Sequence, residues 1–198
     1  MLILAILAGF MIGVGAIINL MVGEIWGAIF FSLGLMTIIY FKFNLFTGKV
    51  GLLMTREIDI WQLMLIWSGN LTGAVFCGLL ILTTPIGEQV HAAAVNIKLL
   101  RNSQTFYENM VLGIFCGLLM YIAVFGFAKS NKPIFIIMPV AFFILCGFNH
   151  CVADMFYLSV GGSKFIDLLP LIPTTLGNLV GANIIPFFLW LNEKTRTT

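Results

Sequence analysis

Residues 69–74 of this 198-residue chain read GNLTGA, and residues 177–182 read GNLVGA. The two stretches differ at one position, and each lies inside a strongly apolar segment. The same shift of 108 residues relates the pair Ala8-Gly9 to the pair Cys116-Gly117. A six-residue match that includes an asparagine is hard to attribute to chance. We therefore predict an internal repeat, with one copy over about residues 1–85 and the other over about residues 105–192.

The composition of the chain indicates that this repeat lies in a membrane. Hydrophobic residues make up 61% of the chain and charged residues 9%, where soluble domains have about 45–50% and about 25%. The mean hydropathy is +1.09. So little charge cannot cover the surface of a soluble globule, which excludes a soluble enzyme, a nucleic-acid-binding protein and a disordered chain. The net charge of +2 is too small to suggest a polyanionic partner.

Six apolar segments have about the length of a transmembrane helix, which needs about 20 apolar residues. The predicted spans are Leu2–Val22, Trp26–Lys42, Trp61–Leu82, Tyr107–Phe127, Pro133–Leu158 and Leu169–Leu191. The connections between them are too short to hold a soluble domain. We therefore predict an all-α integral membrane protein with one transmembrane domain over residues 1–198.

The number of spans decides how the two copies of the repeat are related. Each copy contains three spans, and because three is odd, the second copy must enter the membrane in the opposite sense. Such an inverted three-plus-three repeat is typical of transporters and channels. The glycines of the repeated motif and its asparagines, Asn70 and Asn178, allow two interpretations. They serve close helix packing only, or the asparagines also meet a pore or support broken helices.

Two of the predicted spans contain polar interruptions at equivalent places. The apolar run of the second span gives way to KFNLFTGK at residues 42–49, and the fifth span contains GFNHCVAD at residues 147–154. Polar, non-helical backbone at membrane depth survives only where protein or water satisfies it. We therefore predict that the second and fifth helices are broken and that a pathway lies between the breaks. Asn149 and Asp154 join Asn70 and Asn178 as candidates for supporting the broken helices.

His150 is the most distinctive residue of the second interruption. An ionisable residue within a membrane span is by default a functional hypothesis, here a pore residue that exchanges a proton or contacts an anion. The alternative is a histidine that is simply hydrogen-bonded within the bundle. The other histidine, His91, falls in the connection between the third and fourth spans, so a multi-histidine metal or haem site is not expected. No cofactor is predicted.

The basic residues predict the orientation in the membrane, because cytoplasmic connections carry an excess of lysine and arginine. One side of the membrane receives Lys49, Arg56, Lys129, Lys132, Lys194 and Arg196. The other side receives Lys98, Arg101 and Lys164. The larger group predicts that both termini are cytoplasmic, in a multi-pass protein of the plasma membrane.

The two interruptions also carry a family resemblance. Residues 45–48, LFTG, and residues 147–156, GFNHCVADMF, resemble the two signature segments of the formate/nitrite transporter family. The second resembles the family pattern Gly-Phe-Glu-His-x-x-Ala-Asn-Met, and the likeness runs from Ala8-Gly9 to Gly177-Asn178. The resemblance implies homopentamers with one pore per protomer through an aquaporin-like six-helix bundle. It also implies passage of small monovalent anions such as formate, nitrite, hydrosulfide, acetate or lactate.

The resemblance implies roles for individual residues. Thr47 matches the pore threonine of the family, and His150 matches its central histidine. The apolar side chains that narrow the pore beside it are matched by Leu35, Phe143 and Phe31.

The family also has a lysine ahead of the fourth span that attracts the anion, and this chain offers Arg101 or Lys98 for that role. The chain departs from the family pattern on both sides of the central histidine. Asn149 stands where the family has glutamate, and Asp154 where it has asparagine. A carboxylate has thus moved from one side of the histidine to the other. Gly117 also replaces an asparagine that is typical of the fourth span.

These features predict a channel or transporter for small monovalent anions. Basic residues attract the anion to the pore, and Lys42 or Lys49 does so on the side of the membrane opposite to the basic residue ahead of the fourth span. Thr47 orients the anion, and His150 balances the proton and the charge. Formate or nitrite is favoured, and hydrosulfide or a short monocarboxylate is the alternative. A water or glycerol channel fits less well, because neither break contains an Asn-Pro-Ala motif. An enzyme or electron carrier would need several converging histidine, cysteine or acidic residues. The expected partners are the anion, protons, lipid and further copies of the chain.

Overall fold

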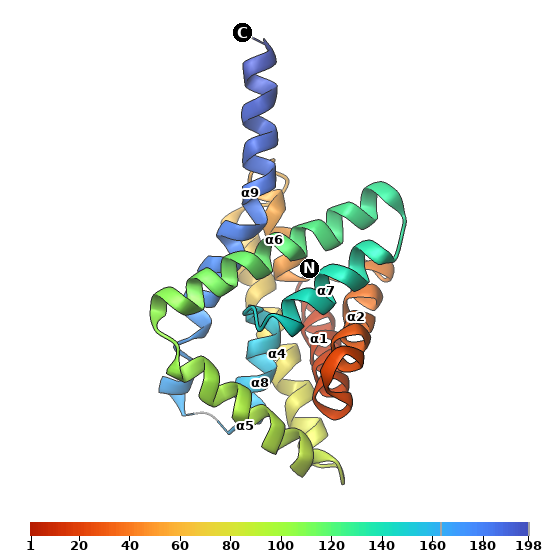
Figure 1. The fold of residues 1–198 in the computed structure, drawn as a ribbon, viewed down its shortest axis with the longest axis vertical. Coiled ribbons are helices and arrows are strands. Elements are labelled where there is room, and N and C mark those ends of the chain that lie inside the picture. Colours follow the sequence, from red (N-terminus) through yellow and green to blue (C-terminus); the bar gives the residue numbers. More distant parts are fainter. Residues whose placement is uncertain (163, 198) are drawn as a thin grey trace.

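The computed structural model describes residues 1–162 and 164–197, and these residues form helices and short connections without a strand (Figure 1). The helices are α1 (Leu2–Val22), α2 (Glu24–Tyr40), α3 (Phe46–Lys49), α4 (Ile60–Leu82), α5 (Gly87–Ser103), α6 (Phe106–Ser130), α7 (Ile134–Leu145), α8 (Cys151–Val160) and α9 (Leu171–Thr197). Two 3₁₀ turns are added by η1 (Val50–Leu52) and η2 (Phe165–Leu168). The predicted all-α fold class is confirmed.

Four of the described helices, α1, α4, α6 and α9, are long and apolar enough to cross a membrane on their own. The first predicted span coincides with α1. The shorter apolar helices α2, α7 and α8 lie where the second and fifth spans are predicted. Six crossings would require α7 and α8 to share one crossing, so the number of crossings stays a prediction.

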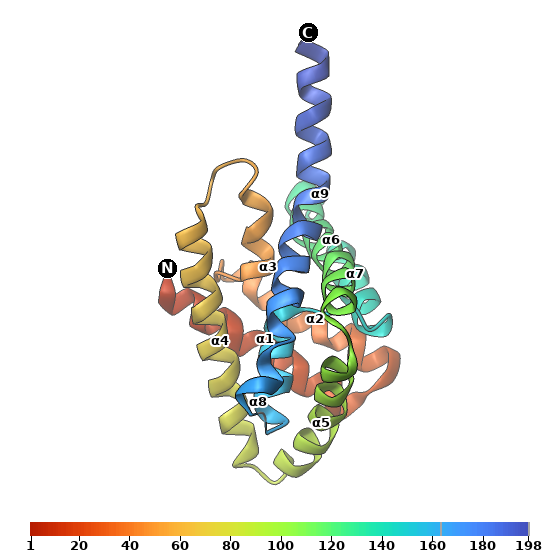
Figure 2. The same ribbon diagram turned by 90° about the vertical axis from the view of Figure 1, so that its left-hand side faces the viewer.

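Corresponding helices of the two predicted repeats make corresponding contacts. Helix α1 packs against α4 and α2, and α6 packs against α9 and α7 (Figures 1 and 2). Gly9 in α1 lies so close to the carbonyl of Asn70 that a Cβ there would overlap it. Gly117 in α6 lies equally close to the carbonyl of Asn178. The glycines of both copies thus allow two helix backbones to touch, which is the packing role expected of small residues in membranes.

Helices α2 and α7 end in the same turn. Lys42 and Gly147 occupy equivalent places just beyond the two helices, with left-handed φ angles of 56° and 71°. In both cases the next backbone N–H bonds the carbonyl five residues before it, at 2.8 Å. This pattern, with a left-handed residue after the helix, is the Schellman motif. The chain is then non-helical until α3 begins at Phe46 and α8 at Cys151.

The structure differs from the predicted boundaries in several places. The second helix ends before Lys42, and helix resumes at Cys151, so the polar stretch at residues 147–154 is only partly non-helical. Helix α9 continues past Leu191 and projects from the body of the molecule (Figures 1 and 2).

The connection that contains His91 is the helix α5 rather than a loop, and it packs along α8. Its inner face buries Val90, Ala94 and Arg101, which recur at helical spacing. The segment is too polar for a membrane-spanning helix, so a search for long apolar runs does not find it.

Candidate functional site

Asn70 in α4 ties together the segments that surround the first break. Its side-chain amide Nδ2 donates to the carbonyl oxygens of Ala5 at 2.8 Å and Asn44 at 2.9 Å. Its Oδ1 accepts the backbone N–H of Phe46 at 2.8 Å. The side chain is fully buried, and its bonds to Asn44 and Phe46 satisfy two backbone groups at the break that have no helical partner, while its bond to Ala5 ties the break to α1.

Asn178 in α9 repeats this arrangement at the second break. Its Nδ2 donates to the carbonyl oxygens of Gly113 at 2.9 Å and Asn149 at 2.8 Å, and its Oδ1 accepts the backbone N–H of Cys151 at 2.9 Å. Of the two interpretations left open by the sequence, the contacts of both asparagines favour support of the interrupted segments. Neither side chain lines one of the two cavities described below.

His150 and Thr47 join the two breaks. Ala153 donates its backbone N–H to Nδ1 of His150 at 3.1 Å, so Nδ1 carries no proton in this arrangement. The ring proton therefore sits on Nε2, which donates to Oγ1 of Thr47 at 2.9 Å. Both side chains are buried. Because the Thr47 oxygen accepts from His150, the Thr47 hydroxyl proton is left to donate to a ligand.

Apolar side chains surround this pair. The ring of Phe143 stacks on His150 with centroids 5.4 Å apart, and Phe31 meets Phe143 edge-on at 5.7 Å. Phe31, Leu35 and Phe143 are each at most 3% exposed. They come from α2 and α7, the two helices that end at the breaks. The structure thus places Phe143 against the histidine and Phe31 against Phe143, and Leu35 belongs to the same buried cluster as these two rings.

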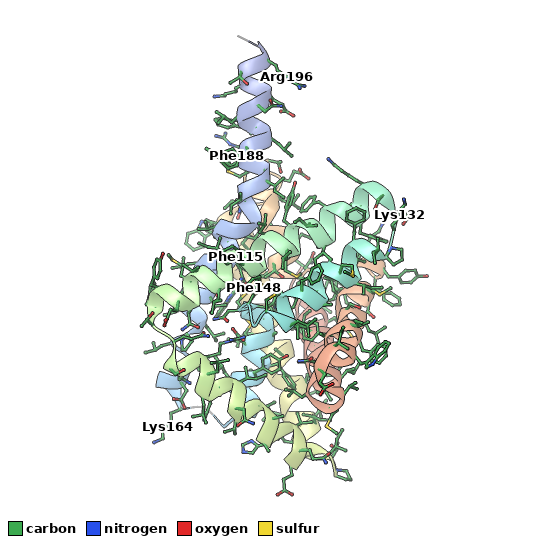
Figure 3. The ribbon with its side chains drawn as sticks, viewed as in Figure 1. Phe115, Lys132, Phe148, Lys164, Phe188 and Arg196 are labelled. Atoms are coloured by element: carbon green, nitrogen blue, oxygen red, sulfur yellow. The ribbon has the colours of Figure 1, made fainter. Side chains whose placement is uncertain are left out.

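A cavity of about 180 Å³, here called the Arg101 cavity, lies on one side of this constriction. Its lining includes Asn19, Arg101, Phe143, Phe148, His150, Asp154 and Tyr157. Nε of Arg101 donates to Oδ1 of Asp154 at 3.0 Å. Phe148 stacks on Phe115 beside the cavity, with centroids 5.2 Å apart (Figure 3).

Lys98 does not line the Arg101 cavity. Its Nζ lies 3.8 Å from Oδ2 of Asp167 and 3.4 Å from the carbonyl of Gly162. Of the two residues that the sequence offered for attracting an anion, Arg101 therefore stands beside His150 and Lys98 stands away from it.

A second cavity of about 320 Å³, here called the Lys42 cavity, is lined by Leu35, Leu45 and Gly48 among others. Lys42 and Lys49 are also part of its lining, and none of the described residues that line it is acidic. Leu35 of the constriction and Gly48, which follows Thr47, line this cavity, whereas Phe143 and His150 line the Arg101 cavity, so the two cavities reach the His150–Thr47 pair through different residues.

Asn149 takes part in an amide network that sequence reasoning missed. Its Nδ2 donates to Oδ1 of Asn109 at 2.7 Å and to Oε1 of Gln104 at 3.0 Å. Asn109 in turn donates to the backbone carbonyl of Arg101 at 3.1 Å. The signal in the sequence for this network was Asn109, an asparagine in the first turns of an otherwise apolar helix. Among the described residues, no three histidine, cysteine or acidic side chains gather to hold a metal ion.

Comparison with known proteins gives consistent matches over most of the chain. The family model for the formate/nitrite transporter matches residues 1–191. Formate channel FocA of Haemophilus influenzae is 28% identical over 200 residues, which cover 80% of this chain and 70% of that relative. FocA of Escherichia coli K12 is 29% identical over 201 residues with the same coverage. A solved pentameric formate channel with formate bound is similar with a TM-score of 0.82 and 26% identity, covering 97% of this chain and 96% of that one.

Proposed function

The chain belongs to the formate/nitrite transporter family, and we propose that it passes small monovalent anions, formate first among them, through the constriction between the Arg101 and Lys42 cavities. The family consists of multi-pass membrane channels and transporters rather than enzymes. Nitrite is the close alternative, followed by hydrosulfide and by acetate or lactate. The proposed pathway runs through each protomer of a homopentamer, as suggested by the similar pentameric formate channel.

The observation that carries this proposal is the buried His150–Thr47 pair between two cavities that both contain cationic side chains. Positive charge and hydrogen-bond donors along a pore favour an anion over a cation. Lys42 and Lys49 supply positive charge on one side, and Arg101, whose charge is balanced by Asp154, supplies a hydrogen-bond donor on the other.

The apolar constriction determines how an anion can pass. A bare ion in a low-dielectric medium costs on the order of tens of kcal/mol, reduced by water and by relaxation of the protein. Desolvation also favours the neutral acid over its anion. We infer that Thr47 donates its hydroxyl proton in a hydrogen bond to the anion beside Leu35 and Phe143. His150 then takes up a proton from the cavity on Nδ1, which breaks its bond with the Ala153 N–H, and gives its Nε2 proton to the anion, directly or through a water molecule, so that the neutral acid enters the constriction.

Membrane placement follows the distribution of charge. Arg196 lies at the projecting end of the molecule and Lys164 at the opposite end (Figure 3). We propose a plasma membrane protein with both termini in the cytoplasm, on the side with more basic residues. Large apolar side chains such as Trp61 and Phe115 remain exposed in the single chain. Lipid and neighbouring protomers would cover such side chains.

The proposal is tested by uptake into proteoliposomes that contain the purified wild-type protein or the His150→Phe variant. Labelled formate, nitrite, hydrosulfide and lactate are compared while the internal pH is recorded. We expect saturable uptake of formate with a linked pH change in the wild type, and loss of the linked pH change in the variant. His91→Gln is the matched control, because His91 lies outside both cavities and bonds the carbonyl of Val160.

Two results would overturn the proposal. Wild-type vesicles that are tight to all four anions, with the protein folded and assembled, would exclude the anion pathway. Full proton-coupled uptake by His150→Phe would exclude the role of the histidine and leave the pathway standing.

A further inference from the structure

Arg101 and Asp154 form a buried ion pair with an unusual geometry. Their side chains are 7% and 2% exposed, and one bond of 3.0 Å joins Nε to Oδ1. Nη1 of Arg101 and Oδ2 of Asp154 are both buried and have no hydrogen-bonding partner among the residues that the structure describes. Arginine and carboxylate usually bond through two parallel contacts when the pair serves stability. Here the side-on contact leaves a guanidinium donor unused.

An unused buried donor is costly, because its hydration is lost and nothing replaces it. The Arg101 cavity adjoins this ion pair, since Arg101, Asp154 and His150 all belong to its lining. The donor is therefore best explained by a ligand that accepts a hydrogen bond inside this cavity.

The surrounding contacts fix the pair relative to His150. Arg101 comes from the last turn of α5, and its backbone carbonyl accepts a hydrogen bond from Asn109 at 3.1 Å. Asp154 lies in the first turn of α8, four residues after His150, which caps that helix. The carboxylate thus holds the guanidinium against the same helix end that carries the histidine.

We propose that Asp154 is a positioning residue, which holds the Arg101 guanidinium by its Nε so that Nη1 binds an oxygen-bearing monovalent anion in the cavity beside His150. This inference rests on the proposed function and narrows its substrate class. The pair has no net charge, so it binds through a directed hydrogen bond rather than through bulk attraction. Directed donors favour the oxygen acceptors of formate and nitrite over the sulfur of hydrosulfide.

An alternative role for Asp154 is that of a simple counter-charge to Arg101. The two roles predict different selectivity. A change in net charge alters the attraction of formate and hydrosulfide by the same factor, because both are monovalent. A change in the position of the donor alters the binding of formate more than that of hydrosulfide. The ratio between the two anions therefore distinguishes positioning from counter-charge and from a purely structural contribution.

The experiment uses the assembled protein in proteoliposomes and labelled formate. The half-saturation concentration for formate is measured together with the hydrosulfide concentration that halves formate uptake. For Asp154→Leu we expect the formate value to rise about tenfold and the hydrosulfide value to change less than about twofold. Asp167→Asn is the matched control, because Asp167 pairs with Lys98 away from the cavity, and we expect neither value to change.

A second variant covers the case in which Asp154→Leu does not fold, because that change leaves Arg101 unpaired. The double variant Arg101→Gln/Asp154→Asn removes both charges and keeps the net charge of the cavity at zero. We expect the same loss of preference for formate in this variant. If Asp154 is only a counter-charge, the double variant should keep the wild-type values for formate and hydrosulfide, because the net charge of the cavity is unchanged.

The positioning role would be overturned if the formate and hydrosulfide concentrations shifted by the same factor in Asp154→Leu. It would also be overturned if the double variant kept the wild-type ratio of the two concentrations. In both cases formate uptake by the wild type would still support the proposed function. A wild type that passes no anion overturns both.

Discussion

The two breaks of the chain share their supporting hydrogen bonds and differ in the side chains around them. Asn70 and Asn178 each bond two carbonyls and one N–H at equivalent places. The first break presents Thr47 and the second presents His150. The backbone groups of any interrupted helix need partners inside a membrane, so the support is the same in both halves. The side chains that face the pathway do not have to satisfy these backbone groups, so they can differ between the two breaks.

The cavities continue this difference. The Arg101 cavity contains a cation that is held by its own carboxylate. The Lys42 cavity contains two lysines and no acidic side chain. Anions are therefore expected to meet a directed donor on one side of the constriction and a diffuse positive field on the other.

The shared support is tested most severely by Asn70→Leu and Asn178→Leu. Each change leaves two buried backbone groups at its break without a partner, one carbonyl and one N–H, and each such group costs about 1–3 kcal/mol. We expect both variants to lose at least about 2 kcal/mol of stability and to yield little assembled protein. Thermal unfolding in detergent and size-exclusion chromatography measure the loss.

The control for these variants is Asn102→Leu, because Asn102 is exposed and bonds only within α5. A tolerated change at either Asn70 or Asn178 would show that the two breaks are not supported alike.

The difference between the breaks is tested by Thr47→Val, which keeps the shape of the side chain and removes its hydroxyl. The anion loses a donor, and Nε2 of His150 loses its partner. A hydrogen bond to a charged group contributes about 1.5–3 kcal/mol, so we expect formate uptake to fall at least about tenfold. Initial uptake rates at saturating formate measure the effect. An unchanged rate with a folded protein would remove Thr47 from the pathway.

Much of this comparison could be predicted from the sequence. The repeated asparagine motif predicts the corresponding halves, and the polar stretches predict where α2 and α7 end. The predicted first span agrees with α1 at both ends, because an uninterrupted apolar run determines both. These features depend on residue types within a short stretch of chain, which a sequence shows directly.

The contacts between distant residues could not be predicted in the same way. Asp154 was expected to lie near His150, whereas its charge partner Arg101 is 53 residues away in sequence. Their contact depends on α5 being a helix that packs along α8, and α5 has neither the length nor the apolarity of a span. The same holds for the network of Asn149 with Asn109 and Gln104.

The two cavities are compared directly by neutralising the lysines in Lys42→Gln/Lys49→Gln. We expect the half-saturation concentration for formate to rise about three- to fivefold for transport that starts from the Lys42 cavity. In the wild type, high salt should weaken uptake from this side more than uptake from the Arg101 side. Salt screens exposed charges such as Lys42 more strongly than the buried Arg101–Asp154 pair. Equal salt dependence from both sides would contradict the proposed difference.

The smallest expected effect concerns the turn that ends each broken helix. Lys42 adopts a left-handed conformation with φ of 56°, where the second break has Gly147 with φ of 71°. A side chain in this region is strained, whereas glycine adopts it freely. We expect Lys42→Gly to raise stability by about 0.5–1 kcal/mol, since part of the relief is offset by the greater freedom of glycine in the unfolded chain. The reverse change, Gly147→Ala, should lower stability by about 1 kcal/mol. A rise in the melting temperature of Lys42→Gly together with weaker formate uptake from its side would show that the first break keeps a strained lysine for its charge.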